Sequence, residues 1–440
     1  MVYNVQDFGA KRDNRTLDHE AIQAAIDRCA AEGGGTVHVP AGNYRCGTIR
    51  LKSNINLHLE TGAEILGADD PSLYPVIAPT PYGNLPGQIQ ALIWADAVEN
   101  ASITGQGAIV GNGSKSLSIK EAVDVKFRPA LVFCRNSRRI KFIDVTLRHS
   151  SFWTLHLLRC EDVAIRGISI LANKERINTD GIDPDGCRNV IISDCHIVAG
   201  DDCIVIKSTE GDPCENITVT NCVLSSAHAA LKLGTESLAD IRNIVFSNCV
   251  IHKTNVGLAL YMKDGGTYEN IVFSNLVIEA ENEFPVLVDI TPRYYKEPRV
   301  GRIRNVYLDN LIVTGKGRCL VEGAETQPVE NLTLSNITWN ITGTCDPANE
   351  WKPSGGKRVE LDPDRTNYAI QPFHFVIINA CRLRMNNIQL CDQRTDPSPD
   401  RGLVYLEGVN RGFIENVYYD NLLKNLPDVS KQDCFDIVTK

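Results

Sequence analysis

The stretch from Cys187 to Ile278 contains four copies of one short pattern, which read CRNVIISDCHI, CENITVTNCVL, IRNIVFSNCVI and YENIVFSNLVI. Each copy carries an asparagine in its third position, and each asparagine follows the previous one by 27 residues. The four positions are Asn189, Asn216, Asn243 and Asn270. An internal repeat of this length indicates a solenoid, in which successive repeats stack on their neighbours.

Looser copies extend the repeat toward both ends of the chain. CEDVAIRGISI precedes the four, IRNVYLDNLIV and VENLTLSNITW follow them, and CRLRMNNIQL and FIENVYYDNLL lie near the C-terminus. Within each copy, short β-branched runs of alternating polarity are broken by Gly, Asn or Asp, which leaves no room for a helix between strands. Stacked copies then repeat about every 4.8 Å. The sequence therefore predicts an all-β fold, a right-handed single-stranded parallel β-helix.

Two columns of side chains follow from this stacking. Cys195, Cys222 and Cys249 share one position, and we interpret them as an inward column of small apolar side chains rather than as metal ligands. The asparagine column has a structural interpretation as well, because Asn tolerates left-handed turns and its stacked amides can bond along the ladder.

A helix is expected to close the N-terminal end of the solenoid, over residues 17–32. Its apolar positions recur at helical spacing, Thr16 or Asp18 is expected to cap its start, and Gly33 to Gly35 end it. The apolar positions are Ile22, Ala25, Ile26 and Cys29. We predict a single β-helix domain over residues 1–440, from which Asn349 to Asp364 and Gln393 to Arg401 project as loops.

Composition limits the partners and the compartment. The formal net charge is −9 without long acidic blocks, so nucleic acid is not an expected partner. No apolar run reaches about 18 residues, so no membrane span is expected.

The 15 cysteines show no metal-binding spacing, and reduced thiols in a cytoplasmic protein are the plainest interpretation. No signal peptide precedes Tyr3 to Phe8; a removed leader would instead imply a secreted or periplasmic protein. The oligomeric state stays open.

Three acidic residues and a histidine come into register when the coils are aligned. Asp180, Asp202 and His228 fall on successive coils, and Asp201 lies beside them. Like charges on neighbouring coils repel, and such clusters are where one carboxyl becomes an acid and another a base. The alternatives are a solvated acidic rim or a calcium site, for which His228 would be an unusual neighbour.

Adjacent residues of a regular strand face opposite sides, which bears on Asp201 and Asp202. Both carboxylates reach one side only if Gly200 begins a bulge or a turn.

At these residues the sequence resembles glycoside hydrolase family 28, the polygalacturonase family. The resemblance spans the chain from near its start to beyond residue 290. It rests on NTDG from Asn178, GDD from Gly200, a reduced Gly-His-Gly motif around His228, SFWTLHLLRCEDVAIRG from Ser151, and the opening QDFGAKRDN.

The resemblance implies hydrolysis with inversion at the anomeric carbon. Asp201 would be the general acid that protonates the leaving oxygen, and Asp180 and Asp202 would orient and deprotonate the attacking water. His228 would tune the acid and help to hold the substrate. An inverting pair lies roughly 6.5–9.5 Å apart, so the acid has to lie across the cleft from the bases. Trp153 and His156 are expected either to line the cleft or to pack in the core.

The chain departs from the family in its substrate-reading motif. In the family, Arg-Ile-Lys supplies two cations to a uronate carboxylate, whereas here the stretch reads Tyr261-Met262-Lys263. Tyrosine offers one hydroxyl and a stacking face in place of a planar fork of donors. Ala227 and Ala229 replace the glycines that flank the histidine. The residues expected to bind substrate are Asn178, Lys207, Lys232, Tyr261 and Lys263.

The predicted function is inverting hydrolysis of a pectin-type, galacturonate-containing poly- or oligosaccharide, with no cofactor and no metal. One alternative is a hydrolase of the same family that acts on rhamnogalacturonan or another glycan. Two further alternatives are a polysaccharide lyase of the same fold, and a non-catalytic β-helix that binds glycans. Neither exo nor endo action follows from the motifs.

Overall fold

A computed structural model of the chain describes residues 1–79, 88–125, 127–280, 284–292, 299–343, 372–394, 401–420 and 428–440. The chain divides into two compact units, Met1–Val223 and Leu224–Lys440, and each unit is described by itself. The loop predicted over Asn349 to Asp364, and most of the one predicted over Gln393 to Arg401, lie outside the described residues.

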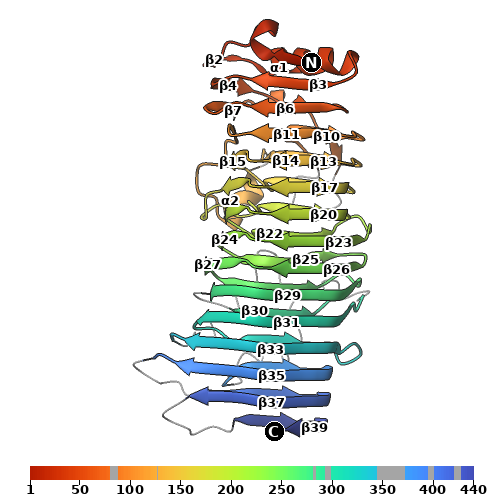
Figure 1. The fold of residues 1–440 in the computed structure, drawn as a ribbon, viewed down its shortest axis with the longest axis vertical. Coiled ribbons are helices and arrows are strands. Elements are labelled where there is room, and N and C mark those ends of the chain that lie inside the picture. The colour runs from red at the N-terminus through yellow and green to blue at the C-terminus, as the bar shows by residue number, and fades with distance from the viewer. Residues whose placement is uncertain are drawn as a thin grey trace. The chain divides into compact units, whose positions relative to one another are not determined.

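The first unit consists of parallel coils whose strands form three stacks, drawn as successive arrows in Figure 1. The first stack is β1 (Val2–Asn4), β3 (Gly35–Val39), β6 (Ile55–Leu59), β11 (Ser102–Gly105), β14 (Lys141–Ile143), β17 (Glu161–Arg166), β20 (Arg188–Ser193) and β23 (Cys214–Thr220). The second is β2 (Asp13–Leu17), β4 (Gly42–Cys46), β7 (Ala63–Gly67), β12 (Ala108–Val110), β15 (Thr146–Arg148), β18 (Ser169–Leu171) and β21 (His196–Ala199). The third is β5 (Ile49–Arg50), β10 (Ala91–Asp96), β13 (Ala130–Arg135), β16 (Leu155–Leu158), β19 (Ile182–Asp185) and β22 (Ile204–Ser208).

Smaller elements complete the first unit. They are the 3-10 helices η1 (Val5–Phe8) and η2 (Pro71–Leu73), the helices α1 (His19–Ala31) and α2 (Ile119–Asp124), and the hairpin of β8 (Ala78–Pro79) and β9 (Gln88–Ile89). Strand β24 (Val223–Ser226) lies at the boundary between the units.

The second unit repeats the pattern with longer, merged strands. One stack contains β26 (Ile241–Ser247), β27 (Val250–Thr254), β29 (Thr267–Ala280), β31 (Arg302–Gly315), β33 (Val329–Ile341), β35 (Ala380–Asp392), β37 (Asn410–Asp420) and β39 (Phe435–Thr439). The other contains β25 (Ala229–Ser237), β28 (Val256–Met262), β30 (Val286–Ile290), β32 (Cys319–Glu322), β34 (Phe373–Ile378), β36 (Gly402–Glu407) and β38 (Val429–Gln432). Parallel pairing within each stack confirms the predicted parallel β-helix.

Identical positions of successive coils fill the interior. In the first unit Ile165, Ile192 and Val219 are register partners on β17, β20 and β23, and all three are fully buried. The alternating residues point outward, as the two-residue period of a strand requires. Each coil therefore contributes the same inward positions to a continuous apolar core.

The asparagine column has the structural role that the sequence predicts. In the second unit Asn270 adopts a left-handed backbone with φ of 59°. Its side-chain nitrogen donates to Asn243 at 3.0 Å, and its side-chain oxygen accepts from Asn305 at 3.0 Å. In the first unit Asn216 donates to Asn189 at 3.2 Å. The amides thus bond coil to coil at a turn that most side chains disfavour.

The cysteine column is buried, as the sequence predicts. Cys195 and Cys222 are nearly inaccessible in the first unit, as is Cys249 in the second, and each thiol donates to the backbone carbonyl two residues earlier. The 14 cysteines of the described residues are all free thiols. They therefore act as small packing groups, and the cytoplasmic location stays a prediction.

The N-terminal helix forms, within narrower bounds than predicted. Helix α1 begins at His19, because Leu17 belongs to β2, which pairs with β4. Asp18 precedes the helix but makes no side-chain capping bond; its carboxylate accepts instead from the backbone N–H groups of Lys11 at 2.6 Å and Arg12 at 3.0 Å. The four predicted apolar residues are all fully buried.

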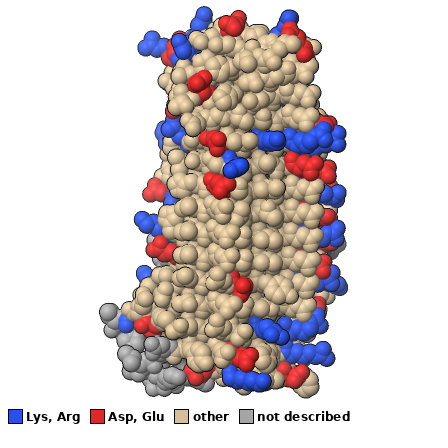
Figure 2. Space-filling model, in the orientation of Figure 1, with Lys and Arg blue, Asp and Glu red and all other residues tan. Residues whose placement is uncertain are grey.

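The outer surface carries charges of both signs. In the view of Figure 2, blue and red side chains gather along the edges, and the strands between them are largely uncharged. No helix of the described residues combines the length and the apolar composition that crossing a membrane would need.

We predict that Asn270→Ala lowers the free energy of unfolding by about 2 kcal/mol, since it removes two hydrogen bonds and leaves a strained left-handed residue. Asn270→Gly removes the same bonds without the strain, so its loss should be about half as large. Circular dichroism melting of both variants checks this. Equal losses would mean that the left-handed backbone contributes nothing.

Candidate active site

Asp180 and Asp202 occupy equivalent positions on adjacent coils of the first unit. Each precedes its strand by two residues, Asp180 before β19 and Asp202 before β22. The backbone N–H of Gly181 donates to the carbonyl of Asp202 at 2.9 Å, and Ile182 pairs with Ile204. The predicted register of these two aspartates is therefore confirmed.

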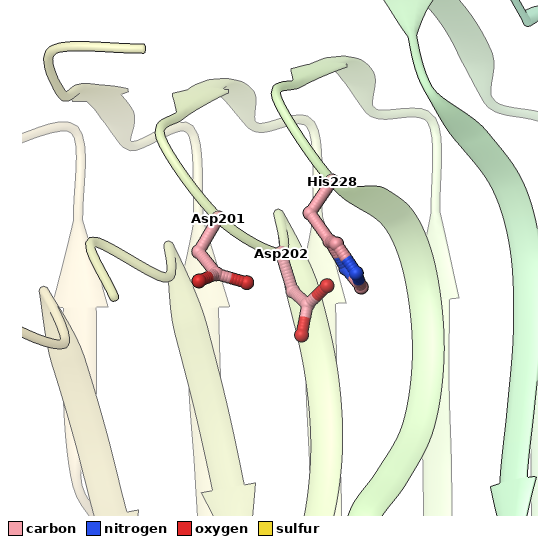
Figure 3. Close-up of side chains that lie close together, drawn as sticks. All are labelled: Asp201, Asp202 and His228. Carbon is pink, nitrogen blue, oxygen red and sulfur yellow. The ribbon is translucent and has the colours of Figure 1, made fainter. Parts of the chain in front are cut away.

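Asp201 and Asp202 lie in the turn between β21 and β22 and reach the same side of the coil, as Figure 3 shows. Carboxylate oxygens of the two residues lie within 4.8 Å of each other. A Cβ atom at Gly200 would lie 2.2 Å from the carbonyl oxygen of Arg176, so only glycine fits. The expectation that Gly200 begins a turn is confirmed.

The turn before Asp180 holds Asp201 in place. Asn178 adopts a left-handed backbone with φ of 53°, and its backbone N–H donates to Oδ2 of Asp201 at 3.1 Å. Its side-chain oxygen accepts from Nη1 of Arg128 at 3.1 Å. A residue predicted to bind substrate thus also links two coils of the site.

Two buried arginines, which the sequence motifs do not point to, support this turn. Arg128 and Arg176 are each less than a tenth exposed, and both donate through Nε to the carbonyl of Ser151, at 3.0 and 3.3 Å. Burial first, and the charge of Arg176 second, lower the pKa of Arg128 to about 10, while Asp180 and Asp201 oppose this. Both guanidinium groups remain protonated near neutral pH, so they place positive charge beside the turn that precedes Asp180.

Lys207, on β22, is almost fully buried among acids. Its ammonium nitrogen lies 3.6 Å from Oδ2 of Asp180 and 3.8 Å from Oδ1 of Asp183. It also lies 4.6 Å from the centre of the Trp153 ring, within the range of a cation–π contact. Its predicted contact with substrate stays a prediction; its contact with Asp180 was not foreseen.

Two further buried aspartates lie on β19, the strand that follows Asp180. Asp185 accepts from the backbone N–H of Thr209 at 2.8 Å and from its hydroxyl, and it faces Nε2 of His156 at 3.1 Å. Burial raises the pKa of Asp183 well above its usual range; the negative charge of Asp180 raises it further, and Lys207 opposes this. The sequence signal was the run TDGIDPD, in which Asp183 and Asp185 occupy alternate positions of the strand that follows Asp180.

An aromatic row borders the site on the coil next to Asp180. Phe152 and Trp153 stack with ring centres 5.1 Å apart, Trp153 meets His156 edge-on at 4.7 Å, and His156 lies 5.0 Å from Phe133. All four are less than a tenth exposed. Trp153 and His156 were expected either to line the cleft or to pack in the core, and the structure shows them packed. Trp153 also contacts Lys207.

The remaining predicted residues belong to the second unit. His228 precedes β25, its backbone N–H donates to the hydroxyl of Ser226 at 2.8 Å, and its ring lies 6.3 Å from that of Tyr261, nearly perpendicular. Figure 3 labels His228 as well. The ammonium of Lys232 lies 4.9 Å from the centre of the Tyr261 ring, and that of Lys263 lies 5.8 Å from it.

Lys263 has an acidic partner that the sequence did not suggest. Its ammonium forms an ion pair with Oδ2 of Asp289, whose other oxygen accepts from the hydroxyl of Thr291. The predicted residues thus form two groups, one in each unit. The first contains Asn178, Asp180, Asp201, Asp202 and Lys207, and the second contains His228, Lys232, Tyr261 and Lys263. Their chemical roles stay predictions.

A family model described as glycosyl hydrolases family 28 matches residues 29–354, about three quarters of the chain. The chain belongs to glycosyl hydrolases family 28. A probable polygalacturonase of Vitis vinifera is 35% identical over 193 residues. That match covers 42% of this chain and 39% of the grapevine protein, so it spans less than half of that relative.

Solved structures of family 28 proteins share the fold. A hyperthermoactive exopolygalacturonase from Thermotoga maritima is 29% identical with a TM-score of 0.66, over 78% of this chain and 87% of that one. A family 28 exopolygalacturonase from Yersinia enterocolitica has a TM-score of 0.70 over 99% of this chain and 78% of that one, and at 20% identity it shows the fold alone. The right-handed parallel β-helix predicted from the repeats is confirmed.

We predict that Lys207→Met lowers the free energy of unfolding by about 3 kcal/mol, because it leaves buried carboxylates without their cation. The matched control is Lys52→Met, which breaks a half-exposed ion pair with Asp27 and should cost less than about 1 kcal/mol. Chemical denaturation of both variants measures the difference. A Lys207 variant as stable as the Lys52 variant would contradict the importance of this pair.

Proposed function

We propose that this family 28 protein is an inverting glycoside hydrolase that cleaves a galacturonate-containing poly- or oligosaccharide. The observation that carries the proposal is the arrangement of three aspartates in the first unit. Asp180 and Asp202 are in register on adjacent coils, and Asp201 projects beside them from a turn that only Gly200 permits. Acid and base supplied by neighbouring carboxyl groups are what hydrolysis of a glycosidic bond requires.

In the proposed mechanism Asp201 protonates the leaving oxygen, while Asp180 and Asp202 orient and deprotonate the attacking water. The N–H of Asn178 donates to Oδ2 of Asp201 and helps to orient its carboxyl group. The base has to be ionised to accept a proton, and the ammonium of Lys207 beside Asp180 favours the ionised form. Oxygens of Asp201 and Asp202 lie within 4.8 Å of each other, closer than the roughly 6.5–9.5 Å of most inverting pairs, so we base the proposed inversion on the family and not on this separation.

Residues of the second unit support a change in the sugar that the enzyme recognises. Tyr261 is an aromatic surface with the lysines 232 and 263 near its ring, and the charge of Lys263 is shared with Asp289. Such a group suits stacking on a sugar better than bidentate binding of a carboxylate. This observation favours the second candidate, a substrate in which a neutral sugar such as rhamnose neighbours galacturonate.

We also propose attack at a chain end rather than within a chain. In the first unit, Ile77 and Ile89, at the two ends of the β8–β9 hairpin, pack against an apolar cluster that includes Phe133 and Leu158. Leu158 ends β16, which pairs directly with β19. The aromatic row and this cluster lie on the coils that precede the one carrying Asp180, and we propose that they close this end of the substrate site. The similar structure from Thermotoga maritima is that of an exopolygalacturonase, which supports this proposal.

Asp201→Asn tests the reaction itself. The amide is nearly isosteric but cannot donate a proton as an acid, so we expect kcat to fall by about 10²-fold or more while oligosaccharide binding is kept. Following the product anomers by NMR in the native enzyme should show inversion. An unsaturated product that absorbs in the ultraviolet would instead indicate a lyase, and binding without turnover would indicate a glycan-binding protein.

The identity of the neighbouring sugar is tested by comparing turnover of oligogalacturonides with that of rhamnogalacturonan fragments. We expect the native enzyme to prefer the rhamnogalacturonan fragments. Tyr261→Arg restores a fork of donors and should shift the ratio toward oligogalacturonides by about tenfold, the effect of one charged hydrogen bond. Strong native activity on plain polygalacturonate would contradict a changed subsite.

Chain-end attack predicts the products. An oligogalacturonide of defined length, labelled at its reducing end, should release single sugars from the first time points, and the viscosity of a polymer should fall slowly. Trp153→Ala shortens the aromatic row and should add longer products. A native enzyme that releases a spread of fragments at once would contradict the proposal.

A further inference from the structure

Asp183 is a buried acid in an unusual setting. Its side chain is fully inaccessible, and among the described residues neither of its oxygens accepts a hydrogen bond. The nearest cation is the ammonium of Lys207, at 3.8 Å. Asp185, two residues along the same strand and equally buried, accepts two hydrogen bonds from Thr209 and faces His156. The two acids on β19 therefore differ in what surrounds them.

The charges around Asp183 are mostly negative. Asp180 lies just before its strand and Asp185 lies on it, and Asp202 lies just before β22 on the next coil. From β16, on the preceding coil, the register partner is His156. Lys207 is the permanent cation among these groups, and it is shared with Asp180 at 3.6 Å. A second full negative charge here would compete with Asp180 for one ammonium.

A buried carboxylate without hydrogen-bond donors costs several kcal/mol, and taking up a proton is the usual way in which this cost is avoided. Burial, followed by the charge of Asp180, raises the pKa of Asp183 well above its usual range, which agrees with the geometry.

We propose that Asp183 is a neutral carboxylic acid in the working enzyme and a positioning residue for Lys207. At 3.8 Å its neutral carboxyl group packs against the ammonium and presents a dipole to it, without taking a share of the charge that faces Asp180. The charge of Lys207 then stabilises the ionised form of Asp180, the form that accepts a proton from the attacking water. The benefit to Asp180 rests on the proposed function, whereas the protonation state of Asp183 does not.

Infrared difference spectroscopy tests the protonation state directly. The spectrum of the native protein minus that of Asp183→Asn, at neutral pH in heavy water, should contain the carbonyl stretching band of a protonated carboxyl group. Asp185→Asn is the matched control: Asp185 has the donors that stabilise a carboxylate, so its difference spectrum should contain carboxylate bands. Carboxylate bands alone in the Asp183 difference spectrum would overturn the proposal.

Kinetics test the positioning role. Asp183→Asn keeps a carbonyl oxygen and no charge, so kcat should stay within about threefold of the native value. Asp183→Ala removes the contact to Lys207 and should lower kcat at least tenfold, with KM changed less. Asparagine as damaging as alanine would mean that the negative charge is needed, and the positioning role would be wrong.

Two further measurements keep the outcomes separate. Melting temperatures of both variants distinguish a loss of Lys207 positioning from a loss of folded protein. If an Asp183 variant does not fold, the protonated-carboxyl band is titrated against pH in Asp201→Asn, which lacks the other proposed acid. That band should persist at pH values where an ordinary aspartate has long been ionised, and its absence would overturn the proposal. A protein that hydrolyses no pectic oligosaccharide but still shows the band contradicts the proposed function and leaves the protonation state of Asp183 supported.

Discussion

Stacking of successive coils in a fixed register is the constraint on which the rest of the structure depends. The backbone ladder sets the spacing between coils, and the left-handed asparagines set where each coil turns. Because register carries every position to the same place on the next coil, residues more than 20 apart in the chain become neighbours. Asp180 and Asp202 meet in this way, through the same hydrogen bonds that build the core.

The acid and base chemistry depends on the surroundings of the aspartates as much as on their number. The first unit buries several carboxylates and supplies one lysine and two arginines nearby. Those cations are held by backbone carbonyls, by an aromatic ring and by the acids themselves. Different surroundings give chemically similar side chains different tasks: Asp185 accepts from the backbone N–H and the hydroxyl of Thr209, whereas Asp183 accepts no hydrogen bond from the described residues.

Most of the fold was predictable from sequence, because a 27-residue repeat leaves few alternatives to a parallel β-helix. The register of Asp180 with Asp202 also followed from aligning the coils, and the turn at Gly200 was the condition under which adjacent Asp201 and Asp202 reach one side. Arg128 and Arg176 were not predictable, since their role depends on carbonyls brought together by the winding of separate coils. The pairing of Asp289 with Lys263 was not predicted, for the same reason. The two residues are 26 apart, and nothing in the local sequence links them. The helix boundary was missed because Asp18 bonds backward to Lys11 and Arg12 instead of capping α1.

The asparagine ladder of the second unit separates the rigid part of each coil from its variable part. Neighbouring amides remain bonded at sequence separations of 26, 27 and 35, and in a second asparagine column Asn387 donates to Asn336 at a separation of 51. The described strands therefore keep their register although the length of chain between them varies. For evolution or engineering, this means that a corner can gain or lose a whole segment, and with it a new surface for recognising sugars, without displacing a single rung.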